Sequence, residues 1–134
     1  RSTLFPYTTL FRSGSALNLL IAVLEKRTKL NLSDKDIYVN VVGGLKLADR
    51  AADLAVAMAI ASAAAGRKLD DGLVVFGEVG LGGEIRSAQG ADKRLNEAKK
   101  LGFTQAIAPA TSGKKNSFVK GVKDLRQALI GYLK

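Results

Sequence analysis

The chain has 134 residues, and its 21 lysines and arginines outnumber its 12 acidic residues, which gives a net charge of +9. It contains no cysteine and no histidine, which excludes a disulfide framework, a Ser-His-Asp triad and the usual zinc ligands. We therefore expect neither a metal site nor a cofactor-binding site here. The length predicts one domain. The basic excess favours a polyanionic partner, first of all nucleic acid, over a solvated surface without a partner.

Residues 1–13, RSTLFPYTTLFRS, differ from the rest and show no amphipathic period. The stretch TLFPYTTLFRS matches the in-frame translation of a common sequencing-library adaptor. We interpret 1–13 as an assembly artefact and 14–134 as the domain, which would then be a fragment of a longer protein. The alternative is a genuine N-terminal strand. No run of about 18 apolar residues is present, so we expect no membrane span and a cytoplasmic location.

The first half of the domain predicts two helices separated by a strand. Apolar residues at 17, 20, 21 and 24 predict a helix from Ser15, and the β-branched run IYVNVVGG predicts a strand at 37–44. The alanine-rich segment 51–65 predicts a helix buried on all sides, because it is apolar around its circumference, and Gly66 ends it. Asp49 is the expected N-cap, and Asp53 lies in the first turn near the positive end of the helix dipole.

The second half predicts strands at 73–79, 83–86 and 104–110, with an amphipathic helix at 90–102. A polar loop at 111–117 precedes a last helix over 118–134, whose inward residues are Val119, Val122, Leu125, Leu129 and Leu133. This order predicts an α/β fold, an α+β sandwich in which one mixed sheet is packed with helices. The glycines of GEVGLGGE are interpreted as turn glycines, because no Gly-Lys-Ser/Thr follows and no G-x-G-x-x-G opens a helix.

Basic residues gather in several stretches of the chain. The DNA-binding candidates are Lys46, Arg50, Arg86, Lys93, Arg94, Lys100, Lys114 and Lys115. Three of them share parts of one helix face, and the last two lie in a Gly/Ser loop that can reach phosphates. Such contacts give sequence-independent, salt-sensitive binding. No aromatic residue interleaves with them, so stacking on single-stranded bases is not predicted. For any single lysine, a solvated surface is the simpler interpretation.

Several long blocks resemble, in order and spacing, the C-terminal Lon-protease-like domain of the RadA (Sms) family of bacterial DNA repair proteins. These blocks are LLIAVLEKR, DIYVNVVGGLKL, AADLAVAMAIASA, VVFGEVGLGGEIR and RLNEAKKLGFTQAIAP. The resemblance covers about residues 16–134. It implies a Lon-protease-like fold from which N-terminal strands are missing, so that the run IYVNVV is left at an exposed edge.

Active Lon-type peptidases use a Ser-Lys dyad, and the resemblance places its serine position at Ala51 and its lysine position at Asp92. The glycine of the same Pro-Ser-Ala-Gly stretch falls on Asp53. An alanine has no nucleophile, and an aspartate cannot act as the amine. Lys93 is a poor substitute because it points about 100° away from Asp92 around a helix.

Two serines could replace the missing nucleophile, but neither is favoured. We expect the hydroxyl of Ser62, inside the alanine-rich helix, to bond a backbone carbonyl. Ser87 is more accessible, yet in a chain without histidine it would need a lysine as its base. We therefore expect this domain to contain no catalytic residue.

RadA-like proteins carry a zinc finger, a RecA-like ATPase core and then this domain; they form hexameric rings and promote branch migration of recombination intermediates. The resemblance thus implies a non-catalytic scaffold that binds double-stranded or branched DNA within a DNA-dependent ATPase. It also implies a RecA-type recombinase as partner, and ATP, Mg²⁺ and Zn²⁺ as ligands of other parts of such a protein. Two alternatives stay open: an active Lon-like peptidase domain, and the Lon-like domain of a competence or chelatase-type ATPase.

Overall fold

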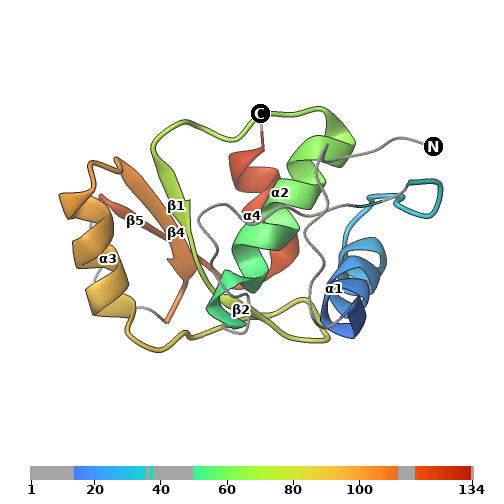
Figure 1. The fold of residues 1–134 in the computed structure, drawn as a ribbon, viewed down its shortest axis with the longest axis horizontal. Helices are drawn as coiled ribbons and strands as arrows, with labels where there is room; N and C mark the ends of the chain where they lie inside the picture. The colour runs from blue at the N-terminus through green and yellow to red at the C-terminus, as the bar shows by residue number, and fades with distance from the viewer. Residues whose placement is uncertain (1–13, 36, 38–49, 112–116, 134) are drawn as a thin grey trace.

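The computed structural model describes residues 14–35, 37, 50–111 and 117–133 (Figure 1). Its helices are α1 (Gly14–Arg27), the short 3₁₀ helix η2 (Arg50–Ala52), α2 (Asp53–Ala65), α3 (Ala91–Lys100) and α4 (Leu125–Tyr132). Its strands are β1 (Leu73–Val75), β2 (Glu78–Val79), β3 (Ile85–Arg86), β4 (Gln105–Pro109) and β5 (Val119–Val122). The strand predicted at 37–44 lies almost entirely outside the described residues.

The described strands form two separate sheets. In the larger sheet β4 lies in the middle and pairs in parallel with β1 and β5, in the order β1-β4-β5. Strands β2 and β3 form an antiparallel ribbon with Glu78 opposite Arg86. The α/β fold class is confirmed. The expected mixture of parallel and antiparallel strand pairs is also found, and within the described residues the two kinds of pair belong to different sheets.

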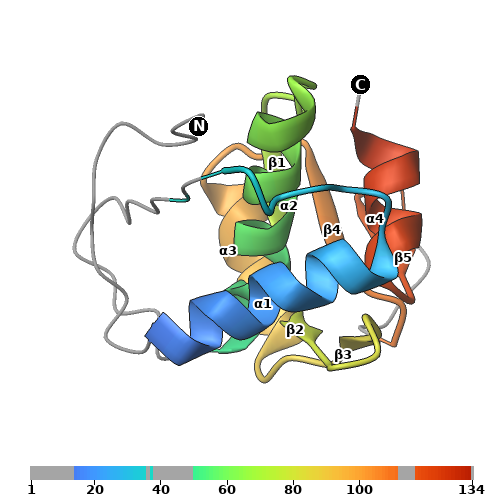
Figure 2. The same ribbon diagram turned by 90° about the vertical axis from the view of Figure 1, so that its right-hand side faces the viewer.

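The helices cover both faces of the parallel sheet. Figure 1 shows α3 on one side of β1, β4 and β5, and α2 with α4 on the other. Helix α1 packs across α2 and α4 on the outside of that layer, as the turned view in Figure 2 shows. The largest fully buried side chains are Leu24, Leu54, Met58, Ile60, Ile107, Val122, Leu125 and Pro109. Burying each large aliphatic side chain contributes about 1.5–3 kcal/mol, so this core fixes the start of α2 firmly.

Helix α2 is less buried than its composition predicts. The buried residues of α2 are Leu54, Ala57, Met58, Ile60 and Ala61, whereas Ala63 and Ala65 are exposed and the other residues are partly exposed. The expectation of burial on all sides is therefore wrong, since one layer of neighbours covers only part of the circumference. The predicted end is confirmed: Gly66 adopts a left-handed conformation with φ 64°.

The segment predicted to form the last helix, residues 118–134, contains a strand followed by a shorter helix. Residues 119–122 form strand β5, and α4 begins only after Asp124, whose side chain accepts a hydrogen bond from the Gln127 backbone N–H at 2.8 Å. The strand forms because β4 pairs with it along its whole length. Gly121 permits close packing there, since a Cβ at that position would lie 2.9 Å from the Ala110 Cα.

The predicted strand at 73–79 is divided in the same way. Strand β1 ends at Val75 and β2 begins at Glu78, and the two belong to different sheets. Gly77 lies at the break, and a Cβ there would be 2.9 Å from the Ile85 Cγ2 atom. No helix within the described ranges is long and apolar enough to cross a membrane.

Candidate functional site at the start of α2

The start of α2 is anchored to the junction between β1 and β2. The Gly77 backbone N–H donates to the Ala51 carbonyl at 2.8 Å, and the Leu54 N–H donates to the Gly77 carbonyl at 3.0 Å. The second bond satisfies one of the backbone donors that a helix leaves free at its N-terminus. Asp49, the expected N-cap, lies outside the described residues; Ala52 directly precedes α2 and makes no side-chain cap.

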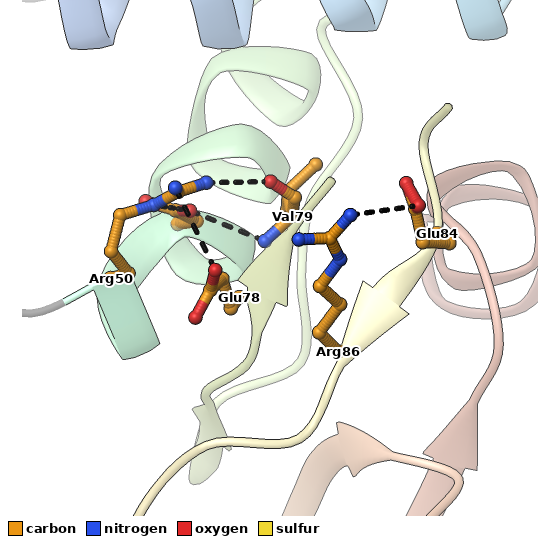
Figure 3. A network of polar contacts seen from close by, with 6 residues as sticks. Arg50, Glu78, Val79, Glu84 and Arg86 are labelled. Carbon is orange, nitrogen blue, oxygen red and sulfur yellow. Dashed lines mark hydrogen bonds and ion pairs between the residues drawn. The ribbon is translucent and has the colours of Figure 1, made fainter. Parts of the chain in front are cut away.

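Side chains complete this anchor in an arrangement that we call the helix-mouth clamp, formed by Arg50, Asp53, Glu78 and Val79. The Arg50 Nε donates to the Asp53 Oδ2 at 2.9 Å, and the Arg50 Nη2 donates to the Val79 carbonyl at 2.8 Å. The same Asp53 oxygen accepts the Val79 N–H at 3.2 Å. The fourth contact is an ion pair in which Glu78 Oε1 lies 3.6 Å from Arg50 Nη1 (Figure 3). The clamp thus ties η2 and α2 to the ribbon.

The electrostatics of the clamp favour its charged form. The hydrogen bond with Asp53 raises the pKa of the Arg50 guanidinium above its usual value, and attraction to Asp53 and Glu78 adds to it against a smaller opposing effect of burial. Asp53 also lies in the first turn of α2, where the helix dipole stabilises a negative charge. The Asp53 side chain is only 22% exposed, whereas that of Arg50 is 57% exposed and therefore screened by water.

The two positions that the resemblance assigns to the peptidase dyad lie on different helices. Ala51 is 5% exposed and sits in η2 beside the clamp. Asp92 is exposed in the first turn of α3, which lies on the other face of the parallel sheet from α2 (Figure 1). Lys93 is also exposed on α3. Among the described residues, the polar side chains of the clamp are a guanidinium and two carboxylates, and these supply neither a hydroxyl nucleophile nor a neutral amine base.

The two candidate serines, Ser62 and Ser87, are not members of the clamp. The Ser62 hydroxyl donates to the Arg67 carbonyl, which confirms the expected bond to a backbone carbonyl. This bond lies at the C-terminal end of α2, where the Arg67 N–H also donates to the Ser62 carbonyl. Ser87 is exposed directly after β3. In the part of the chain that the structure describes, no group of three or more acidic side chains is placed to hold a metal ion.

The DNA-binding candidates separate into two groups. Arg50 and Arg86 both lie at the ribbon. Arg86 is opposite Glu78 in the strand register and 3.6 Å from the Glu84 carboxylate (Figure 3). Both guanidinium groups therefore already contact carboxylates. Lys46, Lys114 and Lys115 lie outside the described residues.

The second group lies on α3. Lys93 and Lys100 are exposed and seven residues apart, so they point to nearly the same side of the helix. The Arg94 Nε donates to the Gln89 carbonyl at 2.9 Å, which holds that side chain at the start of the helix. Lys99 was not among the candidates; its Nζ lies 5.2 Å above the Phe118 ring. We refer to Lys93, Arg94, Lys99 and Lys100 as the α3 cations.

Sequence reasoning missed Glu78 and the Val79 backbone as parts of the clamp. Only the spacing of Arg50 and Asp53, three residues apart, was a local signal for an ion pair. The Val79 contacts span 26 and 29 residues, and no pattern within one element indicates them.

Comparison with known proteins supports the relationship that the sequence blocks suggest. The family model described as subunit ChlI of Mg-chelatase matches residues 12–112. The chain is 47% identical over 117 residues to the DNA repair protein RadA of Salmonella typhimurium and 45% identical over 117 residues to that of Escherichia coli; each match covers 84% of this chain and 25% of the relative. It is 50% identical over 93 residues to RadA of Aquifex aeolicus, covering 69% of this chain and 21% of the relative.

The chain thus spans about a quarter of the length of the curated relatives that it matches. The family match, over residues 12–112, spans both the clamp and α3. The chain belongs to the family described as subunit ChlI of Mg-chelatase, and its homologues are proteins named DNA repair protein RadA.

Proposed function

We propose that this chain is a non-catalytic scaffold and DNA-binding domain, with a Lon-protease-like fold, of a RadA-type DNA repair protein. The observation that carries the proposal is the helix-mouth clamp. At the position where the resemblance puts a serine nucleophile, the chain has Ala51, and the neighbouring Asp53 bonds both Arg50 and the Val79 N–H. The polar groups at the start of α2 bond one another, which serves structure and leaves no activated nucleophile among them.

The scaffold part of the proposal follows from what the clamp connects. Helix α2 contacts α1, α4 and β1, and the clamp adds the β2–β3 ribbon to this set. Each strand of the ribbon is only two residues long, and a two-stranded hairpin is marginally stable alone. The clamp therefore holds an otherwise weak element in a fixed orientation, as a surface for assembly requires.

The DNA-binding part rests on the α3 cations. Lys93 and Lys100 are separated by seven residues, or about 10.5 Å along a helix, which is close to the rise of three base pairs at about 3.4 Å each. Two ammonium groups at this spacing can contact phosphates of one strand. The same helix carries Asp92 and Glu97, so its excess of positive charge is moderate and several contacts are needed for binding.

The wider role is also a proposal. We infer that this domain acts within a ring, hexameric by resemblance, that processes recombination intermediates together with a RecA-type recombinase in the cytoplasm. ATP, Mg²⁺ and Zn²⁺ would be ligands of other parts of a RadA-type protein, because these residues contain neither a Gly-Lys-Ser/Thr phosphate loop nor cysteine or histidine.

The test is DNA binding by the RadA-type protein that contains this domain, measured by fluorescence anisotropy with duplex and branched DNA over a series of salt concentrations. Changing Lys93→Ala together with Lys100→Ala should weaken binding and reduce the salt slope by about 2, since each phosphate contact contributes about 0.9. The control is Lys26→Ala with Arg126→Ala, an equal loss of charge on α1 and α4. An unchanged slope with the α3 pair, or an equal reduction with the control, would contradict the assignment.

The Lys114→Ala and Lys115→Ala pair is tested in the same assay, because these two candidates lie outside the described residues. A loss of affinity and salt slope would place the loop at 111–117 on the DNA surface, and no change would remove it from that surface.

The alternatives have their own discriminating observations. A serine-reactive probe should leave the domain unlabelled, and covalent labelling would favour the peptidase. The relatives named RadA support a RadA-type protein, whereas the match to the family described as subunit ChlI of Mg-chelatase supports the chelatase-type alternative. Upstream gene sequence encoding a four-cysteine finger and a Walker loop would support the RadA-type protein.

A further inference from the structure

A groove opens between α4 and the C-terminal ends of α1 and α2. It has a volume of about 560 Å³ and is lined by the C-terminal end of α1, the residues that follow α2, and α4. Figure 2 shows the C-terminal end of α1 lying beside α4, and these helices contact each other and α2. We call it the C-terminal groove. The parallel sheet lies between α4 and α3, so this groove and the α3 cations are on different sides of the molecule (Figure 1).

The lining of the groove is strongly basic. Its charged residues are Lys26, Arg27, Lys29, Arg67 and Arg126, and no carboxylate lines it. All five residues are exposed. None of them forms an ion pair with a carboxylate in the described part of the chain. Five like charges around one depression repel one another, and the fold supplies no anion among the described residues to offset that cost.

The helix dipoles explain only part of this set. Lys26 and Arg27 lie in the last turn of α1, where a cation is favourable. Arg126 lies in the first turn of α4, where the dipole favours an anion instead. This residue is therefore placed against its local electrostatics, which points to a ligand for the groove.

The groove also has an apolar side. Leu129 is 8% exposed, whereas Ile130 beside it is 74% exposed, and both line the groove with Leu30 and Leu133. These side chains line one groove together with its cations, and an apolar surface rimmed by polar residues marks an interaction site.

We propose that the C-terminal groove binds an acidic, amphipathic segment of a partner protein, with apolar side chains against Ile130 and carboxylates on the surrounding cations. The charge complementarity requires an anion, and the apolar wall requires a hydrophobic face on the same ligand. A nucleic-acid duplex presents phosphates on a convex surface and has no apolar group to fill the groove. A single strand would stack its bases on aromatic rings, and no aromatic residue lines this groove. This inference does not depend on the proposed DNA-binding function.

The test uses a short fluorescein-labelled peptide whose Glu-Leu-Leu-Glu units form an acidic amphipathic helix, titrated with this chain and followed by anisotropy. Two control peptides replace all glutamates by lysine or all leucines by serine. The first peptide should bind and both controls should bind at least about tenfold more weakly, because each loses one of the two complementary features.

Variants then assign the site. Arg67→Glu with Arg126→Glu should weaken peptide binding by at least about tenfold, and Ile130→Gln should weaken it with little change in salt dependence. The matched control, Lys93→Glu with Lys100→Glu, reverses two charges on α3 and should leave peptide binding unchanged. Circular dichroism checks that each variant is folded, and because all the changed residues are exposed, loss of folding is not expected.

Three outcomes would overturn the proposal. One is the absence of peptide binding, and another is binding that the groove variants do not weaken. The third is a groove variant that abolishes binding of duplex DNA or of phosphatidylserine vesicles while peptide binding stays the same, since this would assign the groove to a nucleic acid or a membrane. Loss of DNA binding by the α3 variants alone would support the proposed function and would not affect this inference.

Discussion

Replacing Asp53 by alanine should destabilise the chain by about 2–3 kcal/mol, a large effect for a residue at the start of a helix. One Asp53 oxygen accepts the N–H of Val79, a residue that is 4% exposed. A buried donor left without an acceptor costs about 1–3 kcal/mol. The ion pair with the exposed Arg50 adds at most about 1 kcal/mol, and the helix dipole adds about 0.3–1 kcal/mol.

The chain offers a matched control in Asp92, which is also an aspartate in the first turn of a helix but is exposed on α3. Asp92→Ala should cost only the dipole contribution of about 0.3–1 kcal/mol. Asp53→Asn separates the two effects at the clamp, because its amide oxygen can still accept the Val79 N–H while the charge is lost; its expected cost is about 1 kcal/mol. Urea unfolding followed by circular dichroism measures all three, with equal slopes required for the comparison. Equal costs for Asp53→Ala and Asp92→Ala would refute the structural role of the clamp.

Gly77→Ala should lower the unfolding free energy by more than about 2 kcal/mol, because the added Cβ would meet the buried Ile85 and Pro109. Gly131→Ala in α4 should raise it by about 0.5–1 kcal/mol, because a Cβ there meets nothing within 4 Å. Urea unfolding compares the two variants, and the reverse order would be inconsistent with this packing. Asp124→Ala removes the side-chain cap of α4 and should lower the unfolding free energy by about 1 kcal/mol, and an unchanged value would mean that the cap contributes nothing. Ala51→Ser should not produce labelling by a serine-reactive probe, since the described clamp offers no amine to activate the hydroxyl; labelling would show that a base lies within reach.

Local signals in the sequence predicted those elements whose causes are local. Helix α2 and its end at Gly66 follow from a long apolar alanine-rich run and from the left-handed conformation that glycine adopts easily. The prediction that the last helix begins at residue 118 was wrong, because Val119 and Val122 fit the spacing of a helix that also contains Leu125 and Leu129. Pairing with β4, which lies elsewhere in the sequence, makes that segment a strand.

The same limit applies to the candidate sites. The pair of Arg50 and Asp53 could be predicted from its spacing, but the contacts of both residues with Val79 depend on how the ribbon meets α2. The C-terminal groove is even less predictable from local sequence patterns. Its cations come from residues 26–29, 67 and 126, and as separate short stretches they are indistinguishable from an ordinary solvated surface.

The clamp also bears on what it would take to make this domain a peptidase. A Ser-Lys mechanism needs an accessible hydroxyl at the helix start and an amine within hydrogen-bond reach, in a site with room for a substrate carbonyl. Here position 51 is buried, and Asp53 and Arg50 bond each other and the Val79 backbone. Restoring the serine alone would leave those contacts in place. Removing the contacts would lower the unfolding free energy by about 2–3 kcal/mol and weaken the attachment of the ribbon to α2. Stability and Ser-Lys chemistry therefore oppose each other at this helix start, which agrees with the proposal of a non-catalytic scaffold.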